Sequence, residues 1–228
     1  MTPFEIIQDA FVGGDVANKI ARMNLGTYNP YREFNVAAND IFYSSTGLSF
    51  IPDASYSNFG ETKGYYLSTY LRDFILGSIV YWATAAVWHI AIYRILGNTL
   101  FTSKKRNFPT AATIIDQICL AQSSLVVYAG LPVLSELMIE NKITRVYFYV
   151  DEVGGWGMYF LYFIAYIALV EIGIYWMHRT LHTNKFLYKY VHGLHHKYNK
   201  AETLTPWASL AFNPLDGCLQ VGILLRNI

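Results

Sequence analysis

The sequence predicts an all-α fold, a polytopic membrane helical bundle with a cytosolic His-rich helical cap. Hydrophobic residues make up 54% of the 228-residue chain and charged residues only 14%, whereas soluble domains carry about 25% charged residues. The apolar residues gather in three blocks, each long enough to cross a bilayer. Five of the six histidines follow directly after the third block. These observations predict a membrane protein with a chemical centre beside its last span.

The composition also excludes several classes. A formal net charge of +1 gives no sign of a nucleic-acid partner, and two cysteines do not make a disulfide framework. The chain starts without a basic segment followed by an apolar core, so we expect no cleavable signal peptide. We expect residues 1–72 to form an N-terminal polar region, with a short amphipathic helix near residues 11–25 followed by irregular chain. Residues 73–228 would form the membrane domain.

Three spans are predicted, at about 74–96, 113–139 and 158–177. The first has no charged residue before Arg94, and the third has only Glu171. About 20 apolar residues cross a hydrocarbon core of about 30 Å, and each block reaches that length. A soluble core helix is the alternative for any one block, but three blocks in one chain favour the membrane. Pro132 is expected to kink the second span.

The basic residues predict the orientation of these spans. The first connector contains a cluster of basic residues: Arg94, Lys104, Lys105 and Arg106. Short loops rich in Lys and Arg face the cytosol, so this connector is predicted to be cytosolic. Two further crossings bring the histidine segment to the same side.

The histidines form two boxes. His178 and His182 share one face of a helix that continues the third span, and His192, His195 and His196 share a face if their segment is helical. Only nine residues separate the boxes, so two helices joined there could present five imidazoles to a common space. This pattern predicts a metal centre with all five as ligands. The alternative is an interfacial helix that binds lipid headgroups.

The ligand type narrows the metal. Imidazole suits zinc, iron, copper and nickel, but closed zinc sites usually have four ligands that often include cysteine. Five histidines without a nearby cysteine favour a redox iron centre, with one ion or more. Glu171 lies on the same helical stripe as His178 and His182, and we expect it to accept a hydrogen bond from a ligand histidine. A bond to a neighbouring helix is the alternative. His89, alone in the first span, is expected to be a hydrogen-bonded packing residue.

Three stretches carry a family resemblance: "EIGIYWMHRTLH", "LYKYVHGLHHKYN" and "TLTPWASLAFNPLDGCLQ". They closely resemble the sterol C-5(6) desaturases, or lathosterol oxidases, of the fatty-acid hydroxylase/sterol desaturase superfamily. The resemblance runs from about Tyr70 to Gln220. It implies a multi-pass enzyme of the endoplasmic reticulum membrane with a non-haem di-iron centre.

The resemblance also implies a reaction. Such enzymes use O2 and electrons from NADH, relayed through cytochrome b5 or its reductase, to introduce the 5,6 double bond into a Δ7 sterol. The partners would be the lipid membrane, the sterol substrate and the electron donor. Carried over residue by residue, the iron ligands would be five histidines: His178, His182, His192, His195 and His196.

Two departures from the family are visible. The family has a further His-rich region downstream with another H-x-x-H-H box, whereas this sequence ends at Ile228, so we expect an incomplete membrane domain. The family's usual histidine before proline is here Asn213. Two alternatives therefore stay open. One is a lipid hydroxylase of the same superfamily, and the other is a catalytically inactive form that binds sterol or a full-length partner.

Overall fold

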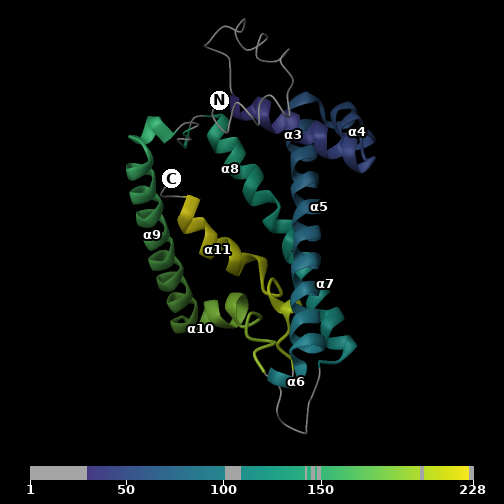
Figure 1. Ribbon diagram of the computed structural model, residues 1–228, viewed down its shortest axis with the longest axis vertical. Helices are drawn as coiled ribbons and strands as arrows, with labels where there is room; N and C mark the ends of the chain where they lie inside the picture. Colours follow the sequence, from purple (N-terminus) through teal and green to yellow (C-terminus); the bar gives the residue numbers. More distant parts are fainter. Residues whose placement is uncertain are drawn as a thin grey trace, which may run out of the picture. The chain divides into compact units, whose positions relative to one another are not determined.

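A computed structural model describes residues 30–100, 109–141, 143–144, 147, 150–200 and 203–225 (Figure 1). These residues form helices and turns, and no strand occurs among them. The all-α prediction is therefore confirmed for this part of the chain. The helix expected near residues 11–25 lies outside the described residues.

The chain forms two compact units. The first contains the described residues up to Arg72 together with Glu136–Ile143, and the second contains Asp73–Ser135 and the described residues from Thr144 onward. The N-terminal unit holds helices α3 (Pro30–Thr46) and α4 (Phe50–Phe59), the start of α5 (Glu61–Ile90) and the end of α8 (Gly130–Glu140).

The expectation of irregular chain up to residue 72 is wrong for residues 30–72, which are largely helical. Their polar side chains pair with one another across the helices. Asn39 Nδ2 donates to Thr69 Oγ1 at 3.0 Å, and the Tyr43 hydroxyl donates to the carbonyl of Ser68. All four side chains are almost fully buried. Polar interiors of this kind have no hydrophobic periodicity, and this is why the sequence pattern missed the helices.

An ion pair lies inside the same unit. Arg72 Nη2 is 3.3 Å from Glu136 Oε1, and Arg72 Nη1 donates to Asn39 Oδ1 at 2.9 Å. Both charged side chains are at least nine-tenths buried. Because a buried charge is costly unless it is paired and hydrogen-bonded, this pair depends on α3, α5 and α8 all being in place.

Three helices are long and apolar enough to cross a membrane: Glu61–Ile95, Ala111–Glu140 and Trp156–Thr183. Each overlaps one of the predicted apolar blocks. The first is α5 with a π-helical extension, η1 (Ala91–Ile95), and the third is α9 (Trp156–Thr183).

The second of these helices is interrupted near its proline. It comprises α7 (Ala111–Tyr128) and α8, with a break at Ala129. The cause is Pro132, which has no N–H for the carbonyl of Tyr128 and whose ring would clash with it. The effect of the proline is therefore seen as this break, three residues before it.

The hydrophobic core of the second unit forms around the loop of residues 203–213. Residues 203–213 pack against α5 and α7, and Trp207 contacts the rings of Tyr81 and Trp82 with centroid separations of 6.1 and 5.4 Å. The Tyr81 hydroxyl donates to the carbonyl of Trp207 at 2.7 Å. This loop also contains the short helix η4 (Pro206–Ala208). It connects the second histidine box to the last described helix.

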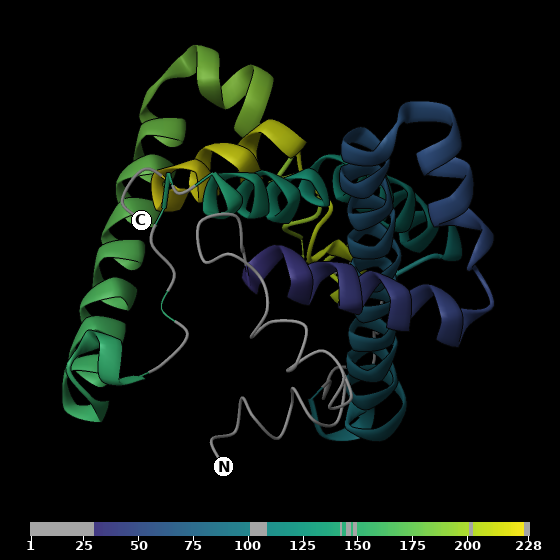
Figure 2. The same ribbon diagram turned by 90° about the horizontal axis from the view of Figure 1, so that it is seen from above.

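That last helix, α11 (Pro214–Leu225), packs against α7 and α9 (Figures 1 and 2). Gly217 makes the close approach to α7 possible, because a Cβ at this position would overlap the ring of Tyr128. The start of α11 is thereby brought beside the histidine segment.

Candidate metal centre

The first histidine box lies on the last turns of α9. His178 and His182 are one turn apart, and their Nε2 atoms are 3.1 Å apart. The helix ends at Thr183, where Asn184 adopts an extended conformation. Its Oδ1 accepts hydrogen bonds from the N–H groups of Phe186 and Leu187 and so caps the next short helix, α10 (Lys185–Leu187). This cap reverses the chain toward the first box.

The spacing of the second box suggested a regular α-helix, but the structure does not have one there. His192 ends a π-helical turn, η3 (Tyr188–His192), and the chain continues in i to i+3 turns through His195 and His196. Gly193 closes the π turn, its N–H donating to the carbonyl of Tyr188 at 2.6 Å. Such π turns are rare and occur frequently at functional sites. The wider turn still brings the second box against the first.

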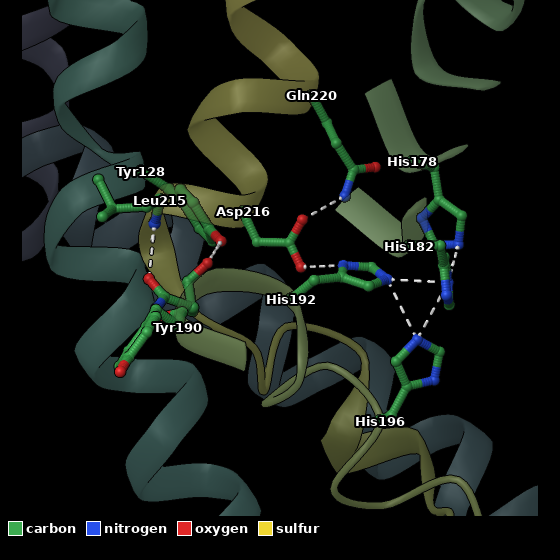
Figure 3. A network of polar contacts seen from close by, with 10 residues as sticks. Tyr128, His178, His182, Tyr190, His192, His196, Leu215, Asp216 and Gln220 are labelled. Atoms are coloured by element: carbon green, nitrogen blue, oxygen red, sulfur yellow. Dashed lines mark hydrogen bonds and ion pairs between the residues drawn. The ribbon is translucent and has the colours of Figure 1, made fainter. Parts of the chain in front are cut away.

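Four imidazoles of the two boxes lie close together, with the ring of His182 between the others (Figure 3). His192 Nε2 is 3.1 Å from His182 Nε2, and His196 Nε2 is 3.3 Å from His182 Nε2 and 3.1 Å from His192 Nε2. His182 Nε2 therefore has three close nitrogen neighbours, which are the Nε2 atoms of His178, His192 and His196. An imidazole nitrogen carries either one proton or one lone pair, so hydrogen bonding cannot explain three such contacts at one atom.

A shared metal ion explains them. Nitrogens about 2.0–2.1 Å from an ion stand about 3.0 Å apart at a right angle and about 3.4 Å apart at the tetrahedral angle. The observed separations of 3.1–3.3 Å lie within this range. The ligand nitrogens of His178, His182 and His192 all lie within 4.8 Å of one another, so these three residues could hold a transition-metal ion that prefers imidazole, and His196 Nε2 lies beside two of them.

His195 is placed differently from the other four. Its ring stacks on His192 with centroids 5.1 Å apart and meets Phe212 edge-on at 5.5 Å. In the described part of the chain, no hydrogen-bond contact within the cluster involves this ring. The ring of His195 therefore lies beside the cluster, but its nitrogens make none of the close contacts that join the other four rings. Its role as a ligand stays a prediction.

Desolvation supports the neutral form of His195 and His196. Partial burial is the main cause that lowers the pKa of His195 and of His196, and the neighbouring His192 lowers both further. A lowered pKa keeps these rings deprotonated near pH 7, and only the deprotonated ring binds metal.

Asp216 on α11 is a site residue that the sequence pattern missed. Its Oδ2 lies 2.8 Å from His192 Nδ1, and its Oδ1 accepts from Gln220 Nε2 at 2.8 Å (Figure 3). Both Asp216 and His192 are fully buried. A single acid in the first turn of a helix is usually explained by the helix dipole, so the sequence offered no distinct signal.

The other expected residues lie as follows. Glu171 is exposed on α9, two turns before His178, while the carboxylate in contact with a box histidine is that of Asp216. The expected hydrogen bond from a ligand histidine to Glu171 stays a prediction. His89 packs against Tyr93 with ring centroids 4.7 Å apart. Its buried Nδ1 has no hydrogen-bond partner within the described residues, so the expected bond is not at this atom.

Comparison with known proteins now defines the class. Residues 163–227, which contain both boxes and Asp216, match the family model described as Fatty acid hydroxylase. The segment that carries the imidazole cluster is therefore similar to a fatty acid hydroxylase domain. No solved structure matches the chain significantly.

Individual relatives narrow the class to one branch. The chain is 42% identical over 163 residues to the putative Delta(7)-sterol-C5(6)-desaturase 2 of Arabidopsis thaliana, covering 72% of this chain and 57% of the relative. It is 43% identical over 154 residues to the Delta(7)-sterol-C5(6)-desaturase of Nicotiana tabacum, covering 68% and 56%. The lathosterol oxidase of Rattus norvegicus is 34% identical over 98 residues, covering 41% and 30%.

The protein is thus a relative of the sterol C-5(6) desaturases, which are oxidoreductases, and the predicted resemblance is confirmed. The matched part spans a little over half the length of the two plant relatives.

Proposed function

We propose that this protein acts as a sterol C-5(6) desaturase, introducing the 5,6 double bond into a Δ7 sterol in the endoplasmic reticulum membrane. One observation carries the proposal. Four histidine Nε2 atoms lie 3.1–3.3 Å from their neighbours in the cluster, within a chain 42% identical over 163 residues to a protein named as such a desaturase.

The reaction balances with the co-reactants expected for the family. Two hydrogens leave the sterol ring, NADH supplies two electrons through cytochrome b5 or its reductase, two protons are taken up from NADH and solvent, and one O2 becomes two molecules of water. Non-haem iron, when bound, supplies the activation of oxygen that removal of hydrogen from an unactivated C–H bond requires.

The protein's own residues would hold this ion. His178, His182 and His192 would provide three ligand nitrogens, His196 lies beside two of them, and His195 is a neighbouring donor for a second ion of a di-iron centre. Four ligands leave coordination positions open for oxygen, which closed structural sites do not have. Because His192 is fully buried, the protein shields the cluster from water on that side.

The location of the cluster supports access for both partners. Lys197 and Tyr198, which follow the second box, each bond Asp116 near the start of α7 at 2.6 Å. The Tyr93 hydroxyl in η1 donates to the carbonyl of Leu204 at 3.2 Å. These contacts at the ends of apolar helices support a location of the cluster near a bilayer surface. A sterol in the leaflet and a soluble electron donor could both reach such a site, which we propose faces the cytosol.

Membranes containing the protein test the proposal when they are supplied with a Δ7 sterol, NADH, cytochrome b5 and its reductase under oxygen. Mass spectrometry should detect the 5,6-unsaturated product with the wild-type chain and not with His182→Ala. A hydroxylated product would instead identify a lipid hydroxylase. Sterol binding without turnover would identify a non-catalytic protein.

A further inference from the structure

We propose that Asp216, held in place by Gln220 and Asn213, is a positioning residue that fixes the tautomer and the ring orientation of His192. The inference rests on the proposed function only in that the imidazole cluster holds a metal ion. It assigns to the start of α11 a role in building the metal centre.

The geometry selects one tautomer of His192. The carboxylate accepts a hydrogen bond from Nδ1–H at 2.8 Å, so the lone pair lies on Nε2. In the opposite tautomer, the proton on Nε2 would point to the place where the Nε2 atoms of His182 and His196 lie 3.1 Å away. Asp216 therefore favours the form of His192 that binds metal.

The charge of Asp216 indicates the same role. Both residues are fully buried, and a buried carboxylate is costly unless an opposite charge compensates it. The hydrogen-bond partners of the Asp216 carboxylate are the His192 imidazole and the uncharged Gln220 amide. A divalent cation bound by Nε2 of the same imidazole would supply a compensating positive charge. The hydrogen bond between Asp216 and His192 would therefore be most stabilising when a metal is bound.

Asn213 ties the two segments together. Its Oδ1 accepts from the N–H of Leu215 at 2.9 Å and caps α11, while its Nδ2 donates to the carbonyl of Tyr190 at 3.1 Å. Tyr190 lies in the π turn that ends at His192 (Figure 3). One side chain therefore joins the helix that carries the carboxylate to the turn that carries the imidazole.

Cobalt binding tests the inference without turnover. The detergent-purified chain is titrated with Co²⁺, and visible absorption reports both affinity and ligand geometry. Asp216→Asn, which keeps the side chain's size, should weaken Co²⁺ binding by about 10–100-fold and alter the spectrum. Asp151→Asn makes the same chemical change at an exposed residue of helix η2 (Val150–Val153) and should leave both unchanged.

Two further variants keep the test decisive if Asp216→Asn fails to fold. Gln220→Leu removes the donor that orients the carboxylate but leaves its charge, and it should weaken binding by a smaller factor. Asn213→Asp keeps the cap on α11 but removes the donor to Tyr190, and it should also weaken binding. Melting with a chelator present measures the stability of each variant separately.

A purely structural role has a different signature. Asp216→Asn would then lower the melting temperature of the metal-free protein but leave Co²⁺ affinity and spectrum as in the wild type, which would overturn the inference. Unchanged binding in both Gln220→Leu and Asn213→Asp would also contradict it. If the wild type itself binds no Co²⁺, the metal centre fails, and that result is distinct from failure of the Asp216 inference alone.

Discussion

Gln117 and Thr205 form a buried hydrogen bond that joins α7 to the loop after the second histidine box: the Thr205 hydroxyl donates to Gln117 Oε1. The other end of the same amide donates to the carbonyl of Thr203 at 2.6 Å. Asp116, the preceding residue, accepts from Lys197 and Tyr198. Two adjacent side chains of α7 thus hold both ends of the segment between the second box and η4.

Replacing Gln117 with leucine should loosen this segment. The substitution removes two hydrogen bonds and leaves the Thr203 carbonyl without this donor, so we expect a loss of stability of about 1–3 kcal/mol. Co²⁺ affinity should fall as well, because the second box is less well positioned. Thermal melting and Co²⁺ titration measure the two effects.

Gln122→Leu is the matched control for this prediction. Gln122 lies on the same helix, but its Oε1 accepts from Ser78 on α5 at 3.2 Å. This variant should lower the melting temperature without changing Co²⁺ affinity. Equal effects of both substitutions on affinity would mean that Gln117 contributes only to helix packing.

The histidines should differ in how strongly each retains metal. His182 Nε2 has three close nitrogen neighbours, whereas the ring of His195 stacks beside the cluster. We therefore expect His182→Ala to lose the bound metal almost completely and His195→Ala to keep one ion per chain. Elemental analysis after gel filtration gives the ratio, with His89→Ala as the control that binds like the wild type. Complete loss in His195→Ala would show that four ligands do not suffice.

Metal binding should also stabilise the fold. A ligand at about 100 times its Kd stabilises the native state by about 2.7 kcal/mol, so Fe²⁺ added without oxygen should raise the melting temperature, and a chelator should reverse the rise. Mg²⁺ is the control, because it prefers oxygen ligands. A rise of the same size with Mg²⁺ would point to a non-specific ionic effect.

The sequence predicted the parts of this molecule that have a repeating pattern. The apolar blocks and the i, i+4 pair His178 and His182 follow from periodicity alone. The contact of Asp216 with His192 spans 24 residues and depends on how α11 packs, and no local pattern encodes that packing. The π turn ending at His192 is likewise set by tertiary contacts. The sequence could not predict it, because the spacing of the histidines in the second box is typical of an α-helix.

The N-terminal unit illustrates the same limit, because long-range polar pairing replaces an apolar stripe there.

The buried pair of Arg72 and Glu136 in this unit leads to the last prediction. Arg72→Met should destabilise the protein by about 3–5 kcal/mol, because it leaves the Glu136 carboxylate buried without this cation. The double variant Arg72→Met with Glu136→Leu removes both charges and should recover a large part of that loss. Chemical denaturation in detergent measures the three proteins side by side. If the double variant is no more stable than Arg72→Met, the helices are held by the packing of the arginine stem and by its bond to Asn39 rather than by charge compensation.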